Sequence, residues 1–230
     1  MGLLRDNMGP LHYFFPTGRI VQPARPSAVF VNGYFTTRAC GATLVHAMGG
    51  PDKVMQPALG GMAGEWQTAR VDTSARLLAT SILSLPADQR PWLVGHSLGG
   101  VICRYAVHTY GLAERVAGVI TLGTPHQGVR AIALAFVMGA GLVGPAALDL
   151  FPNSRPMKVF AKRGWPYSIP LISIAGRKDR LCPNWASRLR TEGDMCRFIT
   201  IDGLAHNELI RHQRALSLVR SFVVPYPQSA

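Results

Sequence analysis

The sequence is poor in acidic residues. Twelve aspartate and glutamate residues stand against 24 lysine and arginine residues, giving a formal net charge of +12. Because carboxylates are scarce and no His-x-x-x-His pair is present, we expect no metal and no cofactor. The basic residues are scattered from Arg5 to Arg220 without a nucleic-acid module, so we expect no nucleic-acid partner. The charge is compatible with transient contact with an anionic lipid surface.

Cysteine and targeting signals are also scarce. The four cysteines allow at most two disulfides, and Cys182 and Cys196, which flank a short segment, could pair if the protein is exported. The N-terminal residues MGLLRDNMGPLHYFFP lack a basic start joined to a continuous apolar stretch and a small-residue cleavage site. We therefore predict no signal peptide and a cytoplasmic location, while a secreted, processed form stays open.

The chain has no long uninterrupted apolar segment. Ala131 to Leu148 is free of charge, but Gly139, Gly141 and Pro145 interrupt it. The segment reaches the length at which a membrane helix is considered, yet its glycine and alanine content disfavours one.

The residues that are present suit one folded domain. With 230 residues, 48% of them apolar and 16% charged, the chain fits a single α/β domain over residues 1–230. Short apolar runs predict strands at 28–31, 54–59, 92–95, 116–123, 170–176 and 197–203, and periodic segments predict helices at 36–49, 65–85, 98–110 and 207–223. This alternation predicts a mostly parallel sheet with helices on both faces.

A serine lies between one of these strands and the next helix. In WLVGHSLGGVI (92–102), Ser97 follows a buried apolar run and precedes apolar residues at helical spacing. Gly95 and Gly99 permit the close packing and strained backbone of a sharp turn. Such a turn raises the hydroxyl above the sheet and directs the first helical amides toward it.

Polar residues follow three other predicted strands. These are Asn32-Gly33-Tyr34, Asp179 and His206, and in an open parallel sheet such groups meet at the carboxyl edge. A serine needs a base such as imidazole to accept its proton, and the imidazole needs a carboxylate to fix its tautomer. His206 is favoured over His212, which falls within the predicted closing helix. The residues that compete with Asp179 as the carboxylate are Asp149, Asp194 and Asp202.

Five segments in order resemble α/β-hydrolases of the lipase and esterase kind. They are VFVNGYFTT, LVGHSLGGVICRYA, TLGTPHQG, GRKDRLCP and GLAHNEL, which all lie within residues 28–210. The resemblance implies an α/β-hydrolase fold with Ser97 as nucleophile, Asp179 as acid and His206 as base. It also implies an oxyanion hole formed by the amides of Leu98 and Tyr34. Asn32-Gly33 stands where the family commonly has His-Gly.

The resemblance also predicts a cap or lid formed by residues 125–169. We expect Phe35, His126, Phe136 and Leu142 to contact the substrate, while a packed core helix is the alternative for part of this segment. The expected function is hydrolysis of small-molecule or lipid carboxylic esters through an acyl-enzyme. The alternatives are a thioesterase or acyltransferase that uses the same residues and, more remotely, a non-catalytic ligand-binding protein.

Overall fold

A parallel β-sheet forms the centre of the protein. The computed structural model describes residues 22–34, 36–60, 67–129, 145–165, 167–189 and 193–224. All five strand pairings among these residues are parallel, in the order β2-β1-β3-β4-β5-β6. The strands are β1 (Ala28–Val31), β2 (Val54–Met55), β3 (Trp92–His96), β4 (Gly118–Leu122), β5 (Leu171–Gly176) and β6 (Cys196–Ile201).

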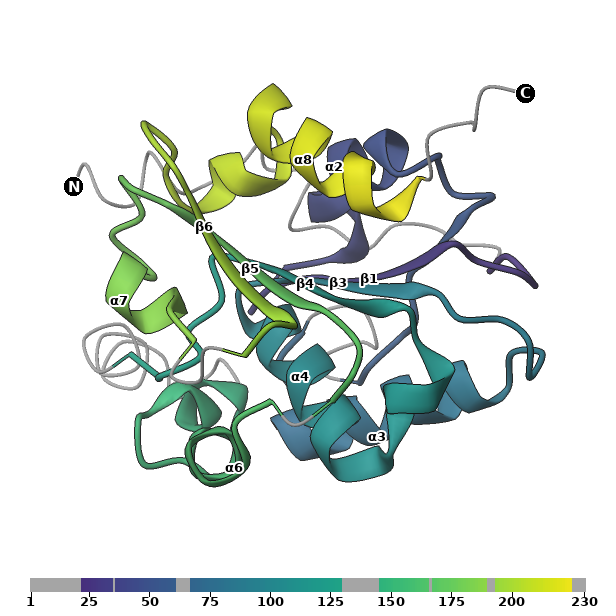
Figure 1. The fold of residues 1–230 in the computed structure, drawn as a ribbon, viewed down its shortest axis with the longest axis horizontal. Helices are drawn as coiled ribbons and strands as arrows, with labels where there is room; N and C mark the ends of the chain where they lie inside the picture. The colour runs from purple at the N-terminus through teal and green to yellow at the C-terminus, as the bar shows by residue number, and fades with distance from the viewer. Residues whose placement is uncertain are drawn as a thin grey trace.

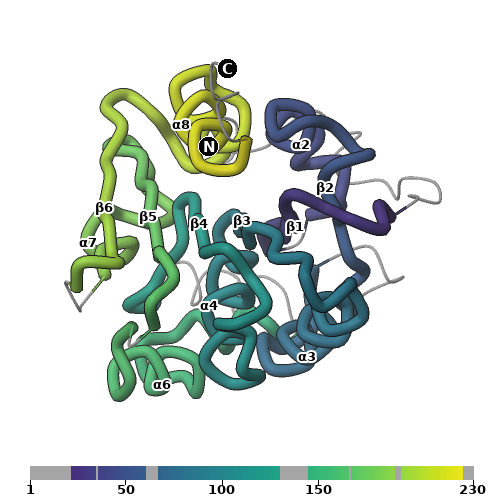
Figure 2. Tube along the Cα trace, turned by 45° about the vertical axis from the view of Figure 1, so that its right-hand side comes forward, coloured from purple at the N-terminus to yellow at the C-terminus, as the bar shows by residue number. Residues whose placement is uncertain are grey.

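Helices cover both faces of this sheet. Helices α2 (Ala42–Ala47) and α8 (Gln213–Val223) lie above it in Figure 1, and α3 (Val71–Leu83), α4 (Leu98–Tyr110) and α6 (Arg155–Arg163) lie below. The rotated view of Figure 2 shows the same two layers. The inner strands β1, β4 and β5 are buried along their whole length, which explains their predominantly apolar sequences.

Each face of the sheet has its own apolar core. The core on the α3 and α4 side includes Leu78, Ile102 and Phe160, and the core on the α2 and α8 side includes Leu44, Ile120 and Val219. The shorter elements are the 3-10 helices η2 (Arg38–Gly41), η4 (Leu112–Arg115), η5 (Pro145–Leu150) and η6 (His206–Ile210), and the helix α7 (Asn184–Ser187). These results confirm the predicted parallel α/β architecture.

Asp149 in η5 stabilises the start of α3. Its Oδ2 accepts a hydrogen bond from the amide of Val71 at 2.7 Å, and its Oδ1 lies 2.8 Å from Arg70 Nη2. Burial raises the pKa of Asp149. An aspartate distant in sequence thus accepts a hydrogen bond from the Val71 amide, which has no partner within its own helix because it lies in the first turn.

Several predicted boundaries differ from the structure. The strand predicted at 54–59 ends at Met55, and the helix predicted at 36–49 is divided into η2 and α2. The closing helix is divided as well: His212 lies at the N-cap of α8, where its Nδ1 accepts from the amide of Arg214 at 3.3 Å, rather than within a continuous helix. Hydrophobic periodicity over a few residues does not reveal such interruptions, because the two helices on either side of each break bury apolar residues in the same core.

The four cysteines are unpaired in the structure. Cys182 Sγ lies 3.1 Å from Ser187 Oγ instead of bonding to Cys196. Within the described ranges, no set of three His, Cys, Asp or Glu side chains is arranged to hold a metal ion. No helix in the described part of the chain has the length and apolarity needed to cross a membrane.

The predicted cap is described only in part. Phe136 and Leu142 lie outside the described residues, as do the other positions from 130 to 144. The rest of the segment includes η5 and α6, whose Met157 and Phe160 belong to the core beneath the sheet. A cap over residues 125–169 stays a prediction, and its α6 part packs as a core helix.

Candidate active site

Ser97 occupies a strained turn between β3 and α4. Its φ of 53° and ψ of −121° make it the one non-glycine residue with positive φ in the described part of the chain. The Ser97 amide donates to Leu122 O at 2.8 Å, and Thr124 Oγ1 donates to Ser97 O at 3.0 Å. These two bonds to β4 and its exit loop hold a conformation that costs free energy on its own.

Two glycines let the backbone approach closely around this turn. A Cβ atom on Gly99 would lie 2.0 Å from Val31 O, and one on Gly95 would lie 2.4 Å from the amide nitrogen of Gly100. Both neighbours are backbone atoms that cannot rotate away. Any larger residue at either glycine of the Gly-x-Ser-x-Gly motif would overlap these backbone atoms.

Asp179 and His206 form a buried pair. Asp179 Oδ2 lies 2.7 Å from His206 Nδ1, and the two residues are 5% and 6% exposed. Asp179 Oδ1 accepts from the amides of Leu181 and Cys182 at 2.9 and 2.7 Å. The carboxylate is thus fixed by its own turn, and it selects the His206 tautomer with hydrogen on Nδ1 and a lone pair on Nε2.

His96 connects the serine turn to His206. Its ring centre lies 4.8 Å from that of His206, and its Nε2–H donates to His206 O at 3.3 Å. Burial, followed by the neighbouring His206, lowers the pKa of His96 well below its usual value, so the ring is neutral. Because His96 directly precedes Ser97, this contact brings the Ser97 turn and the His206 loop together.

Gly123 is a further constraint that sequence reasoning missed. It follows β4 with a φ of +55°, and a Cβ atom there would lie 3.0 Å from both Asp179 Oδ2 and His206 Nδ1. The only signal in the sequence is a glycine directly after a buried strand in TLGTP. Any side chain at this position would compete for space with the pair.

The predicted oxyanion loop lies beside Ser97. A Cβ atom on Gly33 would be 3.2 Å from Ser97 Cβ. Asn32 Nδ2 donates to Thr36 O at 2.5 Å, and Thr36 Oγ1 donates to Gly33 O at 2.8 Å. Asn32 thus fixes the loop from within. Tyr34 lies in this loop, Leu98 is the first residue of α4, and Phe35 lies outside the described residues.

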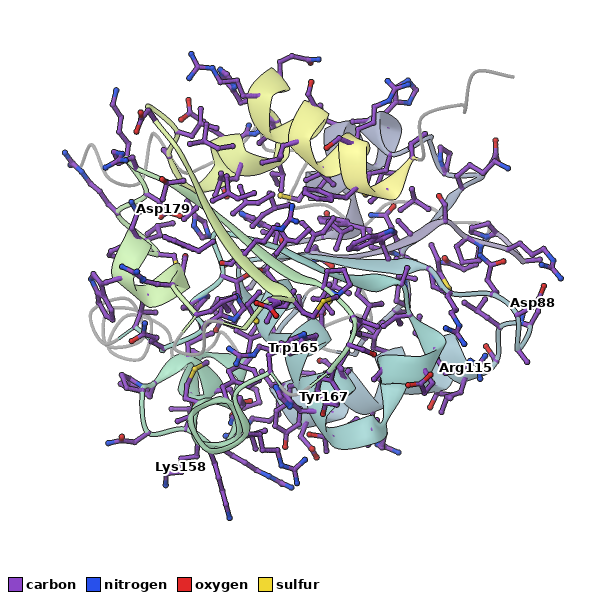
Figure 3. All side chains as sticks on the ribbon, viewed as in Figure 1. Asp88, Arg115, Lys158, Trp165, Tyr167 and Asp179 are labelled. Atoms are coloured by element: carbon purple, nitrogen blue, oxygen red, sulfur yellow. The ribbon has the colours of Figure 1, made fainter. Side chains whose placement is uncertain are left out.

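The competing acidic residues are placed elsewhere. Asp202 is exposed and pairs with Arg177, Asp194 is exposed in the turn before β6, and Asp149 pairs with Arg70. Figure 3 shows Asp179 at the end of the sheet where α7 also lies. Among these candidates, Asp179 is the one that contacts His206.

His126 is buried and lies in the loop after β4. Its Nε2 is 2.9 Å from Thr121 Oγ1, and the residue lines a cavity of about 320 Å³. Burial, with a smaller contribution from Arg104, lowers the pKa of His126 well below its usual value. Contact between His126 and a substrate stays a prediction.

The fold and the serine turn define the chain as an α/β-hydrolase. Solved structures with this fold include a monoacylglycerol lipase from Paleococcus ferrophilus, with 18% identity, a TM-score of 0.61 and coverage of 88% of this chain and 95% of that one. A lipase from Bacillus licheniformis shows 16% identity, a TM-score of 0.66 and coverage of 91% and 96%. A bromoperoxidase from Bacillus anthracis shows 18% identity, a TM-score of 0.66 and coverage of 88% and 92%. Similarity at this level of identity shows the fold alone.

A family model narrows the assignment. The model of palmitoyl protein thioesterases matches residues 44–160, which make up about half of the chain, and no curated protein sequence matches. The chain belongs to the palmitoyl protein thioesterase family. The matched range includes Ser97 and ends before Asp179 and His206.

Proposed function

We propose that the protein hydrolyses carboxylic esters through a Ser97-His206-Asp179 triad. The observation that carries the proposal is the buried 2.7 Å contact between Asp179 and His206, next to the strained turn that presents Ser97. An imidazole held by a carboxylate is suited to accept the proton of a serine during attack on a carbonyl carbon.

In the proposed reaction, Ser97 Oγ attacks the carbonyl carbon while His206 Nε2 accepts its proton. The amides of Leu98 and Tyr34 stabilise the negative charge on the tetrahedral intermediate. His206 then gives the proton to the leaving group, which departs and leaves an acyl-Ser97. Water, activated by the same imidazole, attacks the acyl group and releases the carboxylic acid and free Ser97.

Thioesters are a second substrate class, favoured by the family match. The same groups act on a thioester, with a thiol as the leaving group in place of an alcohol. Small-molecule or lipid acyl compounds are the proposed substrates. Transfer of the acyl group to an alcohol is the remaining variant, in which the alcohol replaces water in the second step.

A fluorophosphonate probe tests the nucleophile, because it modifies activated serines. We expect labelling of the native protein and none of Ser97→Ala, while the exposed Ser84→Ala control keeps native labelling. The same comparison should be made with p-nitrophenyl octanoate and the octanoyl thioester of N-acetylcysteamine. Ser97→Ala should lower kcat/KM by about 10⁴-fold or more on whichever substrate is cleaved.

Two results would contradict the proposal. A folded native protein that is neither labelled nor active would favour a ligand-binding role for the fold. Equal activity of native protein and Ser97→Ala would place the chemistry at another residue. The ratio of ester to thioester rates identifies the preferred leaving group.

A further inference from the structure

A buried cation that pairs with no carboxylate among the described residues lies on α4. Arg104 is 2% exposed, and its one hydrogen bond within the described residues is from Nη2 to Gly164 O at 3.1 Å. Its guanidinium carbon lies 4.2 Å from the centre of the Phe160 ring. The buried Nε atom has no hydrogen-bond partner in the described part of the chain. Burial lowers the pKa of Arg104 to about 10, so the group stays charged at neutral pH.

This arrangement is energetically incomplete. A buried charge is normally paired with an opposite charge or surrounded by hydrogen-bond partners, since its removal from water is costly. One backbone carbonyl and one aromatic face replace only part of the lost hydration. The planar guanidinium retains donors in the geometry that suits a carboxylate or a phosphate.

The guanidinium of Arg104 borders a cavity in which an anion could bind beside it. This cavity of about 320 Å³ is lined by Arg104 and by Lys158 of α6, and no carboxylate belongs to its described lining. The amide side chains of Gln127 and Asn153 also line it. In Figure 3, Trp165 and Tyr167 lie below the sheet, and Lys158 lies on the nearby α6.

A buried histidine ring lines the same cavity. Among the described residues, buried His126 Nδ1 has no hydrogen-bond partner, while His126 Nε2 lies 2.9 Å from Thr121 Oγ1. Nδ1 is a donor in the tautomer that carries the ring hydrogen there, and an acceptor in the tautomer in which Nε2 donates to Thr121 Oγ1 and the Thr121 hydroxyl donates to Ile172 O at 3.4 Å. Met157 and Phe160 supply apolar surface to the remaining wall. The lining therefore combines positive charge and hydrogen-bond donors with an apolar surface.

We propose that this cavity binds an anionic head group, a carboxylate or a phosphate monoester, carried on a short apolar body. Arg104 pairs with the anion, Lys158 adds charge at the cavity wall, and Met157 and Phe160 contact the apolar part. The volume lies at the lower end of the range for small-molecule sites. Neither Asp179 nor His206 belongs to the described lining of this cavity, and its occupation does not require hydrolysis.

Calorimetric titration with three probes of equal chain length tests the site. Octanoate and octyl phosphate carry the two candidate anions, and 1-octanol is the uncharged control. We expect saturable binding of at least one anion, at least tenfold tighter than that of octanol. The stronger of the two anions identifies the head group.

Substitutions assign the binding to Arg104. Arg104→Met removes the charge with a side chain of similar length, and we expect at least tenfold weaker binding of the anion. Lys162→Met is the matched control, because it removes one positive charge from the exposed surface of α6 outside the cavity. The control should bind within twofold of the native protein.

The proposal is overturned if octanol binds as tightly as both anions, which would indicate an apolar site, or if folded Arg104→Met retains native affinity. If Arg104→Met does not fold, the ¹⁵N–¹H signal of Arg104 Nε, assigned with Arg104→Lys, gives the answer in the native protein: it should shift on titration with the anion, and an unshifted signal rejects the site. Ser97→Ala should bind the anion like the native protein. An inactive enzyme would thus contradict the proposed function and leave this result unaffected.

Discussion

Single glycines decide whether the turn around Ser97 can form. Gly99 faces the carbonyl of Val31 at the end of β1, so the helix that follows Ser97 touches the neighbouring strand without an intervening side chain. Gly33 likewise lies close to Ser97, since a Cβ atom on Gly33 would be 3.2 Å from Ser97 Cβ. One added methyl group is therefore large enough to push the Ser97 turn away from β1 and from the Gly33 loop.

We predict that Gly99→Ala destabilises the protein by about 3 kcal/mol, at the upper end of the usual cost of overpacking. The physical reason is the 2.0 Å distance between the added Cβ and Val31 O. Urea unfolding followed by circular dichroism measures the change. Gly193→Ala is the control, because a Cβ there meets no atom of the described residues within 4 Å, and it should change stability by less than about 0.5 kcal/mol. Equal stability of both variants would contradict the close packing.

His108 is a residue whose burial affects stability through pH. The ring is 4% exposed, and its centre lies 5.8, 5.5 and 5.4 Å from those of Phe160, Trp165 and Tyr167. Burial, with smaller contributions from Arg104 and Arg163, lowers the pKa of His108 to about 3. The folded state therefore holds this histidine neutral under conditions in which the unfolded chain protonates it.

We predict that His108 makes the protein less stable in mild acid. Its pKa is lower in the folded state than the ordinary value of 6.5, so its contribution is complete above pH 6.5 and is lost as the pH falls toward about 3. The native protein should lose up to about 1.4 kcal/mol more per pH unit than His108→Gln in this range. Urea unfolding at pH 7, 6, 5 and 4 measures the two slopes. Parallel curves would show that the ring is not held neutral.

At the scale of elements, helices α3 and α4 hold the layer beneath the sheet together. Leu78 of α3 and Ile102 of α4 are fully buried in the same core, while Leu83 at the end of α3 is 51% exposed. Helix α4 also extends from Ser97 to the wall of the Arg104 cavity. Packing of α3 against α4 therefore supports both sites.

We predict that Leu78→Ala destabilises the protein by about 2–5 kcal/mol, because it leaves a cavity in this core. Leu83→Ala removes the same atoms from an exposed position of the same helix and should cost less than about 0.5 kcal/mol. Thermal and urea unfolding of the two variants give the comparison. A small effect of Leu78→Ala would mean that α3 packs more loosely than the structure indicates.

At the scale of the whole molecule, the parallel sheet brings distant segments to one edge. Ser97, Asp179 and His206 follow β3, β5 and β6, and their loops meet where these strands end. The net charge of +12 acts over the same scale. A field of this sign attracts anionic surfaces as well as anionic small molecules.

We predict that the protein associates reversibly with vesicles containing anionic phosphatidylglycerol. The attraction is electrostatic and screened by salt, so binding should weaken about tenfold or more between 20 and 200 mM NaCl. Vesicle sedimentation measures the bound fraction, with zwitterionic phosphatidylcholine vesicles as the control. Equal binding to both vesicle types, or none at low salt, would contradict the prediction.

The sequence by itself determined the features that depend on local chemistry. Buried strands appear as apolar runs. Ser97 stands out because it lies between a strand and a helix, with Gly95 and Gly99 two residues to either side. The predicted α4 range matched the structure, since apolar periodicity and the preceding turn both act within a few residues. Boundaries such as the break at His212 were missed, because the two parts of that segment bury one continuous face.

Only the tertiary structure decided which distant groups meet. From the sequence, Asp149, Asp194 and Asp202 all competed with Asp179, and the structure paired Asp179 with His206, Asp202 with Arg177 and Asp149 with Arg70. It also placed the His96 ring against His206 and buried Arg104 where no carboxylate of the described residues pairs with it. These contacts depend on the packing of segments far apart in the chain, and a linear pattern of residue types carries no record of that packing.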